Sequence, residues 1–188
     1  MPRTTLVGRS TDYPLIYGYC ARERERCAMS QPLSSSDWRE QGVRVIPCNQ
    51  LDPNVPQTPG MNRAAAINYA RVGAEKIWAG TVTIQPSAKT GAHHHGHVES
   101  VIYVVHGKAR MRWGEHLEFV AEAGPGDFIY VPPYVPHQEI NADPNEPLQC
   151  VVVRSDKEPV VVNLDITPVE PPEAVYWVDP GHPPPDTP

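Results

Sequence analysis

Between residues 76 and 164 the chain alternates short apolar runs with turn residues. Each run is rich in β-branched or aromatic residues, and Gly, Pro or Asn separates it from the next, which is typical of strands joined by tight turns. No amphipathic helix of useful length interrupts the series. The pattern therefore predicts an all-β fold, either a sandwich or a closed barrel that hides its sheet edges. The predicted strands are residues 76–86, 101–105, 109–113, 117–121, 127–131, 137–141, 148–154 and 160–164.

Three further segments precede these strands. Residues 42–47 are predicted to form a short strand that ends at its proline. Residues 52–60 are punctuated by prolines and are expected to be a loop that lies across a barrel mouth. Residues 64–70 have the alanine content of a helix, but they are few and a strand run follows, so we expect the first barrel strand there.

Length and proline content predict one domain between two tails. A chain of 188 residues, 40% of them hydrophobic, has room for one domain with a substantial core. Its 23 prolines far exceed the usual share of about 5%, and many lie near the ends. We expect a disordered or extended tail at residues 1–40, the barrel domain at residues 41–166 and a proline-rich tail at residues 167–188.

The first 28 residues have two interpretations. Met29 precedes a polar stretch that would make an ordinary protein start, so residues 1–28 are either an upstream extension from a mis-assigned initiation site or a short regulatory tail. In both cases we expect the barrel to fold without them.

Charge and cysteine content exclude several classes of protein. The net charge is -6 and no basic stripe with interleaved aromatic residues is present, which argues against nucleic-acid binding. No apolar stretch approaches the roughly 18 residues of a membrane span, and no signal-peptide core is seen at the start. The four cysteines are scattered without a C-x-x-C pair, so we expect reduced thiols and a cytoplasmic protein.

A histidine tract and one later histidine carry the candidate chemistry. In an extended strand alternate side chains share a face, so His93 and His95 point the same way and His94 points opposite. His137 offers a third imidazole and Glu99 a carboxylate, which makes three or four protein ligands for a metal, with open positions left over. A solvated loop or an accidental nickel site is the alternative, but this tract is internal and lies between strand-like runs. The sequence therefore predicts a metal site of His93, His95, Glu99 and His137.

These residues resemble the two sequence motifs of the cupin superfamily. The first motif, a glycine, an H-x-H pair, a glutamate and a closing glycine, is approximated by Gly91, His93, His95, Glu99 and Gly107. The second motif is matched at the right spacings by Gly126, Pro132, His137 and Asn141. The resemblance covers residues 75–163 and implies the cupin fold, a double-stranded β-helix or jelly-roll barrel.

The motifs depart from the family pattern at two positions that concern the site. Tyr134 stands where the second motif has its inner glycine, which makes that turn bulkier. Counting back from Gly107, the glutamate position of the first motif falls on Ser100, one residue after Glu99. Glu99 is therefore a ligand only if the strand carries a bulge or the hairpin is one residue longer. His97 is the replacement ligand if Glu99 does not reach the metal.

The resemblance leaves the metal and the reaction open. Imidazole suits zinc, copper, iron and nickel, and an added carboxylate makes iron or manganese reasonable, so we expect a divalent ion: Fe, Mn, Zn or Ni. Cupins include dioxygenases, decarboxylases, isomerases, cyclases and storage proteins, so the resemblance fixes the fold better than the function. Three functions stay open, and no catalytic residue is assigned. They are a metal-dependent enzyme acting on a small organic molecule, foremost an iron-dependent dioxygenase; a redox-neutral isomerase, cyclase or lyase; and a non-catalytic small-ligand binding or sensor module.

Two further segments give predictions about ligands and partners. Arg110 and Arg112 share one strand face, which we expect to be solvated; pointing inward, they would imply a carboxylate or phosphate ligand. Residues 159–164 form an apolar strand after the barrel motifs are complete, so something must cover it. Cupins commonly dimerise, and we predict a homodimer, with residues 148–153 of the same protomer as the alternative cover.

Overall fold

The computed structural model describes residues 38–157 and 160–181. The chain divides into two compact units, residues 1–44 and residues 45–188. The predicted N-terminal tail lies outside the described residues up to residue 37, as do Cys20 and Cys27. In the described part of the first unit, α1 (Trp38–Gln41) is a single helical turn.

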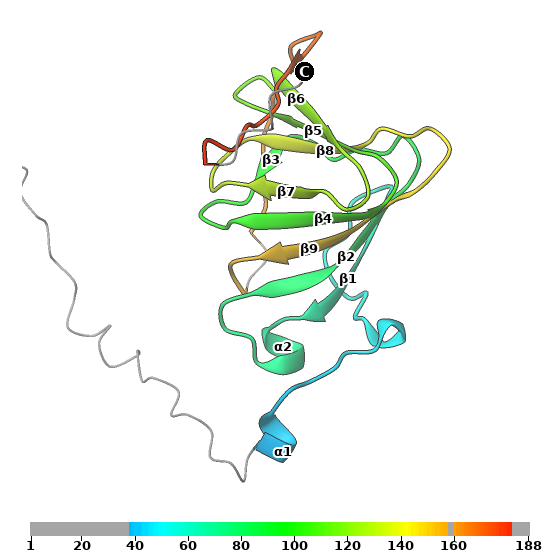
Figure 1. The fold of residues 1–188 in the computed structure, drawn as a ribbon, viewed down its shortest axis with the longest axis vertical. Helices are drawn as coiled ribbons and strands as arrows, with labels where there is room; N and C mark the ends of the chain where they lie inside the picture. Colours follow the sequence, from blue (N-terminus) through cyan, green and yellow to red (C-terminus); the bar gives the residue numbers. More distant parts are fainter. Residues whose placement is uncertain (1–37, 158–159, 182–188) are drawn as a thin grey trace, which may run out of the picture. The chain divides into compact units, whose positions relative to one another are not determined.

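Two β-sheets build the second unit (Figure 1). All neighbouring strands are antiparallel except β6 and β11, which run parallel. This arrangement confirms the all-β fold that the strand pattern predicts and the jelly roll that the cupin resemblance implies. The first sheet has, in order, β1 (Met61–Ile67), β2 (Trp78–Ile84), β9 (Leu148–Arg154), β4 (Ser100–His106) and β7 (Phe128–Val131). The second has β10 (Val162–Asn163), β3 (His93–His94), β8 (His137–Asn141), β5 (Ala109–Trp113), β6 (Phe119–Ala123) and β11 (Glu173–Ala174).

The core lies between the sheets because the strands alternate inward and outward residues. In β4 the residues at positions 100, 102 and 104 are buried and those between them are more exposed. The same period of two appears in β9 and β2, as expected for strands with one face on a core. The resulting cluster of buried side chains comprises Met61, Val82, Ile84, Ile102, Val104, Ala109, Met111, Val131, Leu148, Cys150 and Val152.

The first barrel strand starts and ends three residues earlier than predicted. β1 ends at Ile67 because Asn68 caps a helical turn, α2 (Tyr69–Val72), by accepting a hydrogen bond from Arg71 N at 2.9 Å. Gly73 closes this turn in the left-handed conformation, with φ at 71°. The predicted range, residues 64–70, therefore spans the end of β1 and the start of α2, and Asn68 marks the boundary between them.

Some predicted strands are confirmed and others are wrong. Residues 109–113, 137–141 and 148–154 form strands with the predicted bounds. Residues 42–47 form no strand, and Val43 and Val45 are exposed. β10 has two residues instead of five, and β11 lies in the segment predicted to be a tail.

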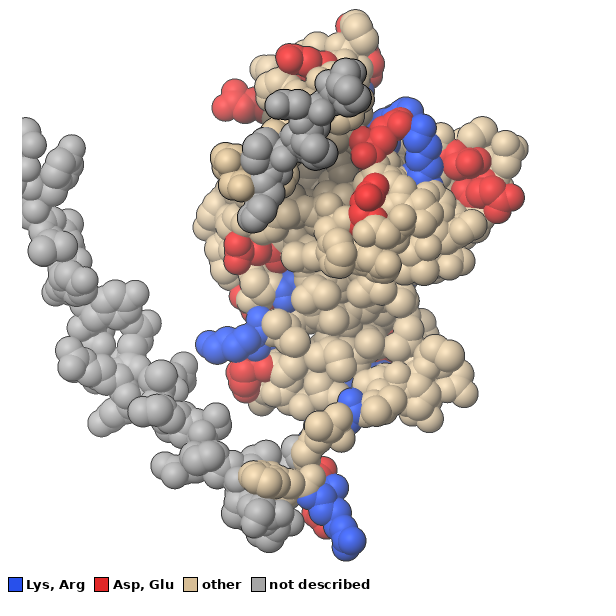
Figure 2. All heavy atoms as spheres, in the orientation of Figure 1, with Lys and Arg blue, Asp and Glu red and all other residues tan. Residues whose placement is uncertain are grey.

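The outer face of the first sheet carries few charges. Figure 2 shows an almost uncharged surface over β7, β4 and β9, and exposed apolar or aromatic residues there include Val101, Val105, Phe128 and Tyr130. Tyr103 and Phe128, opposite each other on β4 and β7, have ring centroids 4.8 Å apart. Within residues 38–157 and 160–181, no helix is both long enough and apolar enough to cross a membrane.

Candidate metal centre

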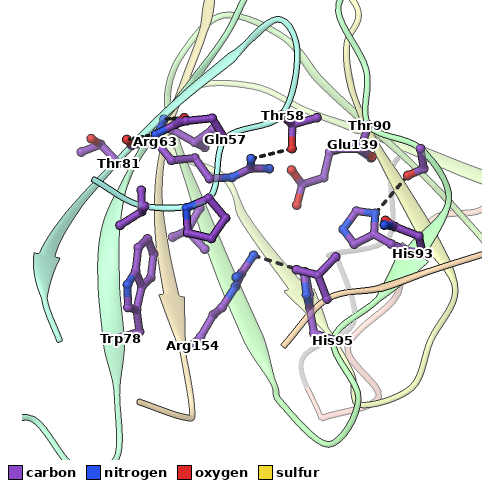
Figure 3. Close-up of a pocket in the computed structure, with 17 residues that line it drawn as sticks. Gln57, Thr58, Arg63, Trp78, Thr81, Thr90, His93, His95, Glu139 and Arg154 are labelled. Atoms are coloured by element: carbon purple, nitrogen blue, oxygen red, sulfur yellow. Dashed lines mark hydrogen bonds between the residues drawn. The ribbon is translucent and has the colours of Figure 1, made fainter. Parts of the chain in front are cut away.

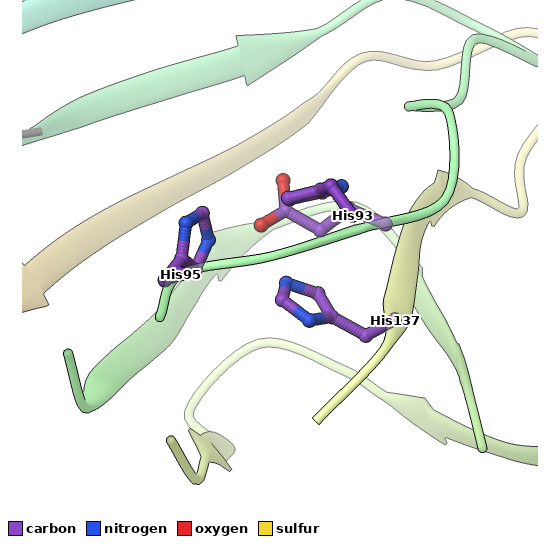
Figure 4. Close-up of side chains that lie close together, drawn as sticks. His93, His95 and His137 are labelled. Carbon is purple, nitrogen blue, oxygen red and sulfur yellow. The ribbon is translucent and has the colours of Figure 1, made fainter. Parts of the chain in front are cut away.

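Strand pairing brings three imidazoles together (Figure 4). β3 pairs with β8 in the register His93 to His137, and residues directly opposite in an antiparallel pair share one side of the sheet. His95 lies two residues after His93 and points to that side as well. The ring centroids are 4.9 Å apart for His93 and His95, 4.4 Å for His93 and His137, and 5.0 Å for His95 and His137. His94 points away, and its Nδ1 accepts a hydrogen bond from Gly96 N.

Backbone carbonyls orient all three rings. The Nδ1–H groups donate to carbonyl oxygens at 3.0, 2.8 and 2.9 Å, from His93 to Gly91, from His95 to Val160 and from His137 to Val135. In a neutral imidazole the other nitrogen, Nε2, is then an acceptor, which is the tautomer that a metal requires. His137 Nε2 is buried and has no hydrogen-bond partner within the described part of the chain. An orphaned acceptor of this kind fits a metal ligand.

Glu139 supplies the carboxylate of the cluster. It lies two residues after His137 on β8, so the two side chains share a face. The candidate ligand atoms of His93, His95, His137 and Glu139 all lie within 4.8 Å of one another, and the four residues are buried. The backbone of Glu139 is fixed by Thr90, whose Oγ1 accepts from Glu139 N and whose N donates to Glu139 O.

The structure does not bring Glu99 to the histidines. β4 begins at Ser100, which is buried, and Glu99 precedes it on the opposite, exposed side, where it accepts a hydrogen bond from Tyr130 Oη at 2.6 Å. β4 does carry an irregularity, a register shift against β9 between Val104 and His106. From Ser100 to Val104 the alternation is regular, so the shift does not turn Glu99 towards the histidines. His97, the predicted replacement, is exposed and pairs with Asp156 at 2.8 Å.

Burial and charge set the protonation of the cluster. Burial, helped by the positive charge of Arg154, lowers the pKa of His95 to about 3. Burial also lowers the pKa of His137. Burial alone would raise the pKa of Glu139, but the surrounding imidazoles and guanidinium groups outweigh it and hold that pKa below its ordinary value. Neutral imidazoles beside an ionised carboxylate are the forms that bind a metal.

Three members of the cluster, His93, His95 and Glu139, line a cavity of about 380 Å³ between the sheets (Figure 3). These candidate metal ligands point into the cavity from the side of the second sheet. Two arginines point into it from the first sheet, Arg63 on β1 and Arg154 on β9. Residues 55–58 of the predicted loop form another part of the wall, as the sequence suggests for a loop across a barrel mouth. β10 contributes Asn163.

The arginines singled out by the sequence lie elsewhere. Arg110 pairs with Glu122 at 2.6 Å on the outside, as expected for a solvated face. Arg112 is buried, yet it does not line the cavity: it donates to Leu117 O and binds Glu170 and the carbonyl of Val169. It thus holds the C-terminal segment against the barrel. The cavity arginines were missed because neither belongs to a motif, and Arg154 ends an otherwise apolar strand.

The donor set defines which metals fit. Three imidazoles and a carboxylate are compatible with zinc and nickel and are well suited to iron and manganese. Four protein ligands also leave open positions on an ion that prefers five or six. The residues present therefore fit a divalent metal with room for another ligand.

Comparison with known proteins agrees with this architecture. A family model described as a cupin domain matches residues 80–154, a segment that contains all four members of the cluster. No curated protein matches the chain.

Solved structures with a similar fold include two of Bacillus subtilis oxalate decarboxylase. A point variant of that enzyme is 25% identical, covers 57% of this chain and 29% of that chain, and has a TM-score of 0.50. A structure concerned with the EPR parameters of its Mn(II) centres is 25% identical, covers 60% and 30%, and has a TM-score of 0.51. The present chain therefore corresponds to only about 30% of the decarboxylase chain.

A third structure shows the fold alone. It is an uncharacterized conserved protein with a double-stranded β-helix domain from Klebsiella pneumoniae, 18% identical to this chain. The match covers 65% of this chain and 98% of that one, with a TM-score of 0.52. A single β-helix domain of this kind therefore also occurs in a chain of little more than its own length.

Proposed function

Since residues 80–154 are a cupin domain whose buried histidines and glutamate line a cavity, we propose that this protein is a metal-dependent enzyme acting on a small organic molecule. The observation that carries the proposal is the position of His93, His95 and Glu139 in the cavity wall. A metal that served folding alone would have a closed ligand set, whereas a catalytic metal keeps a position for water or substrate. A non-catalytic small-ligand binding or sensor module remains the alternative, and it would bind its ligand in the same cavity without turnover.

The first candidate reaction is oxygenation. When bound, iron or manganese would supply Lewis acidity and one-electron chemistry at the open positions. The chain's own residues would do the rest. The carbonyls of Gly91, Val160 and Val135 keep each imidazole in its ligating tautomer, and the burial of Glu139 keeps competing water away from the carboxylate.

The second candidate is a redox-neutral lyase. The specific support is the likeness to oxalate decarboxylase, together with the two guanidinium groups beside the cluster, which suit an acidic substrate. Because this chain corresponds to about 30% of the decarboxylase chain, the whole enzyme's activity is not transferred with the fold.

Elemental analysis of untagged protein tests the enzyme proposal. We expect close to one equivalent of a first-row metal in the wild type and in His94→Ala, and a strong loss in His95→Ala and His137→Ala, because only His94 points away from the cluster. Equal metal content in all four proteins, or none in the wild type after metal-replete growth, would overturn it.

Turnover of small organic acids with and without dioxygen separates the two reactions. An oxygenase consumes dioxygen in proportion to product and stops without it. A lyase that needs no net oxidation releases product at equal rates in the two atmospheres, provided that the bound metal is the same.

A further inference from the structure

The cavity beside the cluster has a charged end and apolar walls. Its volume of about 380 Å³ corresponds to roughly a dozen water molecules at ~30 Å³ each, which is well above the size of oxalate. Arg63, Arg154, His95 and Glu139 gather at the charged end (Figure 3). The apolar part of the wall consists of Val55, Pro56, Val82, Val152, Val161 and the indole of Trp78.

Arg154 is held at the edge of the cluster with donors to spare. Its Nη2 lies 3.3 Å from His95 Nε2, and its Nε is buried without a hydrogen-bond partner within the described residues. The guanidinium lies over the Trp78 ring, 5.8 Å from its centroid, which helps to hold the positive charge in place. Gly80 gives the indole room, because a Cβ there would lie 2.6 Å from the ring.

Arg63 is braced on the other side of the charged end. Its Nη1 donates to Thr58 Oγ1 at 2.8 Å, and the side chain of Gln57 bonds to both the N and the O of its backbone. These neutral partners fix the direction of the guanidinium without neutralising its charge. Its other terminal nitrogen, Nη2, donates to the sulfur of Met61 at 3.4 Å, and sulfur is a weak acceptor.

The charges around the cavity do not balance. Among the described residues neither Arg63 nor Arg154 forms an ion pair with a carboxylate, whereas Arg110 and Arg112 each do. Two guanidinium groups face one carboxylate, Glu139, and a divalent ion would add two further positive charges. A partly enclosed cavity lined by an excess of one sign of charge attracts the opposite sign, so this excess of positive charge favours an anionic ligand.

A carboxylate fits this end better than a phosphate. Guanidinium offers a planar fork that matches a carboxylate, and among the described residues no helix N-terminus of the kind that binds phosphate lines the cavity. The remaining wall is far larger than a bare anion needs, and its six apolar residues lie beside the uncharged polar residues Gln57, Thr58, Thr81, Thr90 and Asn163.

We propose that the substrate is an amphipathic carboxylic acid of about a dozen non-hydrogen atoms, whose carboxylate binds between Arg63 and Arg154 and whose apolar body lies against the valines and Trp78. That this ligand is a substrate rests on the proposed function. The chemical class of the ligand follows from the cavity itself. Arg63 and Arg154 are then binding residues that determine specificity, and the metal cluster lies next to the carboxylate end.

Isothermal titration of the full chain tests the ligand class, with and without Zn²⁺. The probes are benzoate and phenylacetate, each paired with its neutral amide of nearly the same shape, together with oxalate and inorganic phosphate. At least one aromatic acid should bind roughly tenfold or more tightly than its amide, because hydrogen bonds between charged partners are lost in the amide. Neither acid exceeding its amide would overturn the proposal.

The other probes test the apolar body. Oxalate and phosphate should bind more weakly than the better aromatic acid, since neither fills the apolar walls. If oxalate binds most tightly, the proposal that the ligand has an apolar body is wrong. If phosphate binds most tightly, the proposal that its anionic group is a carboxylate is wrong.

Three arginine variants locate the anion. Arg63→Gln and Arg154→Gln should each weaken binding of the aromatic acid roughly 10- to 100-fold and leave amide binding unchanged. Arg110→Gln, which breaks an ion pair on the outer face, should bind the acid as the wild type does. Wild-type affinity in both cavity variants would overturn the proposal, and circular dichroism verifies that each variant is folded.

Metal content separates this inference from the proposed function. Wild-type protein without metal that still prefers acid to amide retains the ligand class and loses the enzyme proposal. Metal-loaded protein that does not prefer acid to amide overturns the ligand class and leaves the enzyme proposal standing. Arg63→Gln is the decisive variant, because Arg63 has no hydrogen bond to a member of the cluster, and its loss should reduce the metal content far less than the loss of a ligand does.

Discussion

Glu139 is the residue on which we expect metal affinity to depend most among the carboxylates near the histidines. Glu139→Gln keeps the shape and removes the charge, and it should weaken metal binding by at least the 10- to 100-fold that supporting residues contribute. Glu99→Gln is the matched control, since Glu99 is exposed and bonded to Tyr130. Competition against a metal-binding dye measures both variants. An equal loss in both would return Glu99 to the ligand set.

Acid should destabilise the metal-free protein through His95. In the unfolded chain this imidazole takes up a proton below about pH 6.5, whereas in the folded protein its pKa is about 3. The unfolded state therefore binds more protons at acidic pH, and stability falls as the pH decreases from about 6.5 towards 3. Above that window both states are neutral and the contribution vanishes.

Melting temperatures between about pH 7 and pH 4 measure this effect. His95→Gln should show a shallower decline than the wild type, because it has no imidazole to protonate at this position. His106→Gln, at the exposed end of β4, is the control and should decline like the wild type. Identical slopes in all three proteins would mean that other groups carry the acid sensitivity.

Tyr134 stores backbone strain in the turn before β8. Its φ of 60° is left-handed, a conformation that costs a residue with a Cβ about 1–2 kcal/mol, and its N donates to Gly96 O at 2.7 Å. Tyr134→Gly should raise the melting temperature by roughly 2–4 °C. Tyr134→Ala removes the same ring but keeps the Cβ, so it should not; a rise in both would point to the ring instead of the backbone.

The candidate site was predictable at three of its four positions. Alternation along a strand selected His93 and His95, and the second motif selected His137. The same alternation applied to His137 also selects Glu139, whereas the glutamate of the first motif corresponds more closely to Glu99. The cavity arginines required the pairing of distant strands, and no local pattern shows that Arg63 and Arg154 meet.

At the scale of elements, the bounds of strands closely flanked by turns were predictable and contacts between segments were not. β5, β8 and β9 have the predicted bounds because turns flank them closely. β11 has only two residues, and it forms because Arg112 holds the preceding segment through Val169 and Glu170. A segment rich in proline gives no sign of such an anchor.

Truncation tests how far the domain extends. The barrel domain proposed for residues 41–166 includes β10, whose neighbour Val160 holds the ring of His95. A chain ending at residue 166 should keep the metal affinity of the full protein, because all ligand supports remain. A chain ending at residue 159 should lose roughly 10- to 100-fold in affinity, as expected when a support of a ligand is removed. Equal affinity in the two chains would show that β10 only covers the site.

At the scale of the whole molecule, the homodimer stays a prediction, but the surface expected to form its interface is no longer residues 159–164. β10 pairs with β3 of its own protomer, so residues 159–164 no longer require a partner. The new reason is the outer face of β4 and β7, which carries few charges (Figure 2). We predict that a second copy of the same face packs against it, since few charges would lose water there. Phe128, with 73% of its surface exposed, stands in this face.

Light scattering of wild type and Phe128→Lys tests this interface. We expect the mass of a dimer for the wild type and of a monomer for the variant, because each lysine would place a charge in the apolar face that the two copies are predicted to share. Val43→Lys, an exposed valine in the first unit, is the control and should leave the mass unchanged. A wild-type monomer at high concentration would contradict the prediction.

The hydrogen bond between His95 and Val160 joins residues 65 positions apart in the chain. Thermodynamic reciprocity gives it a second meaning: if the docked segment strengthens the metal site by some factor, the metal must strengthen docking of the segment by the same factor. Susceptibility of the chain near residue 160 to proteolysis would then report metal occupancy, although the cleaved bond lies outside the ligand set. The segment around Val160, which contributes no metal ligand, would then report through its protease sensitivity whether the site holds a metal.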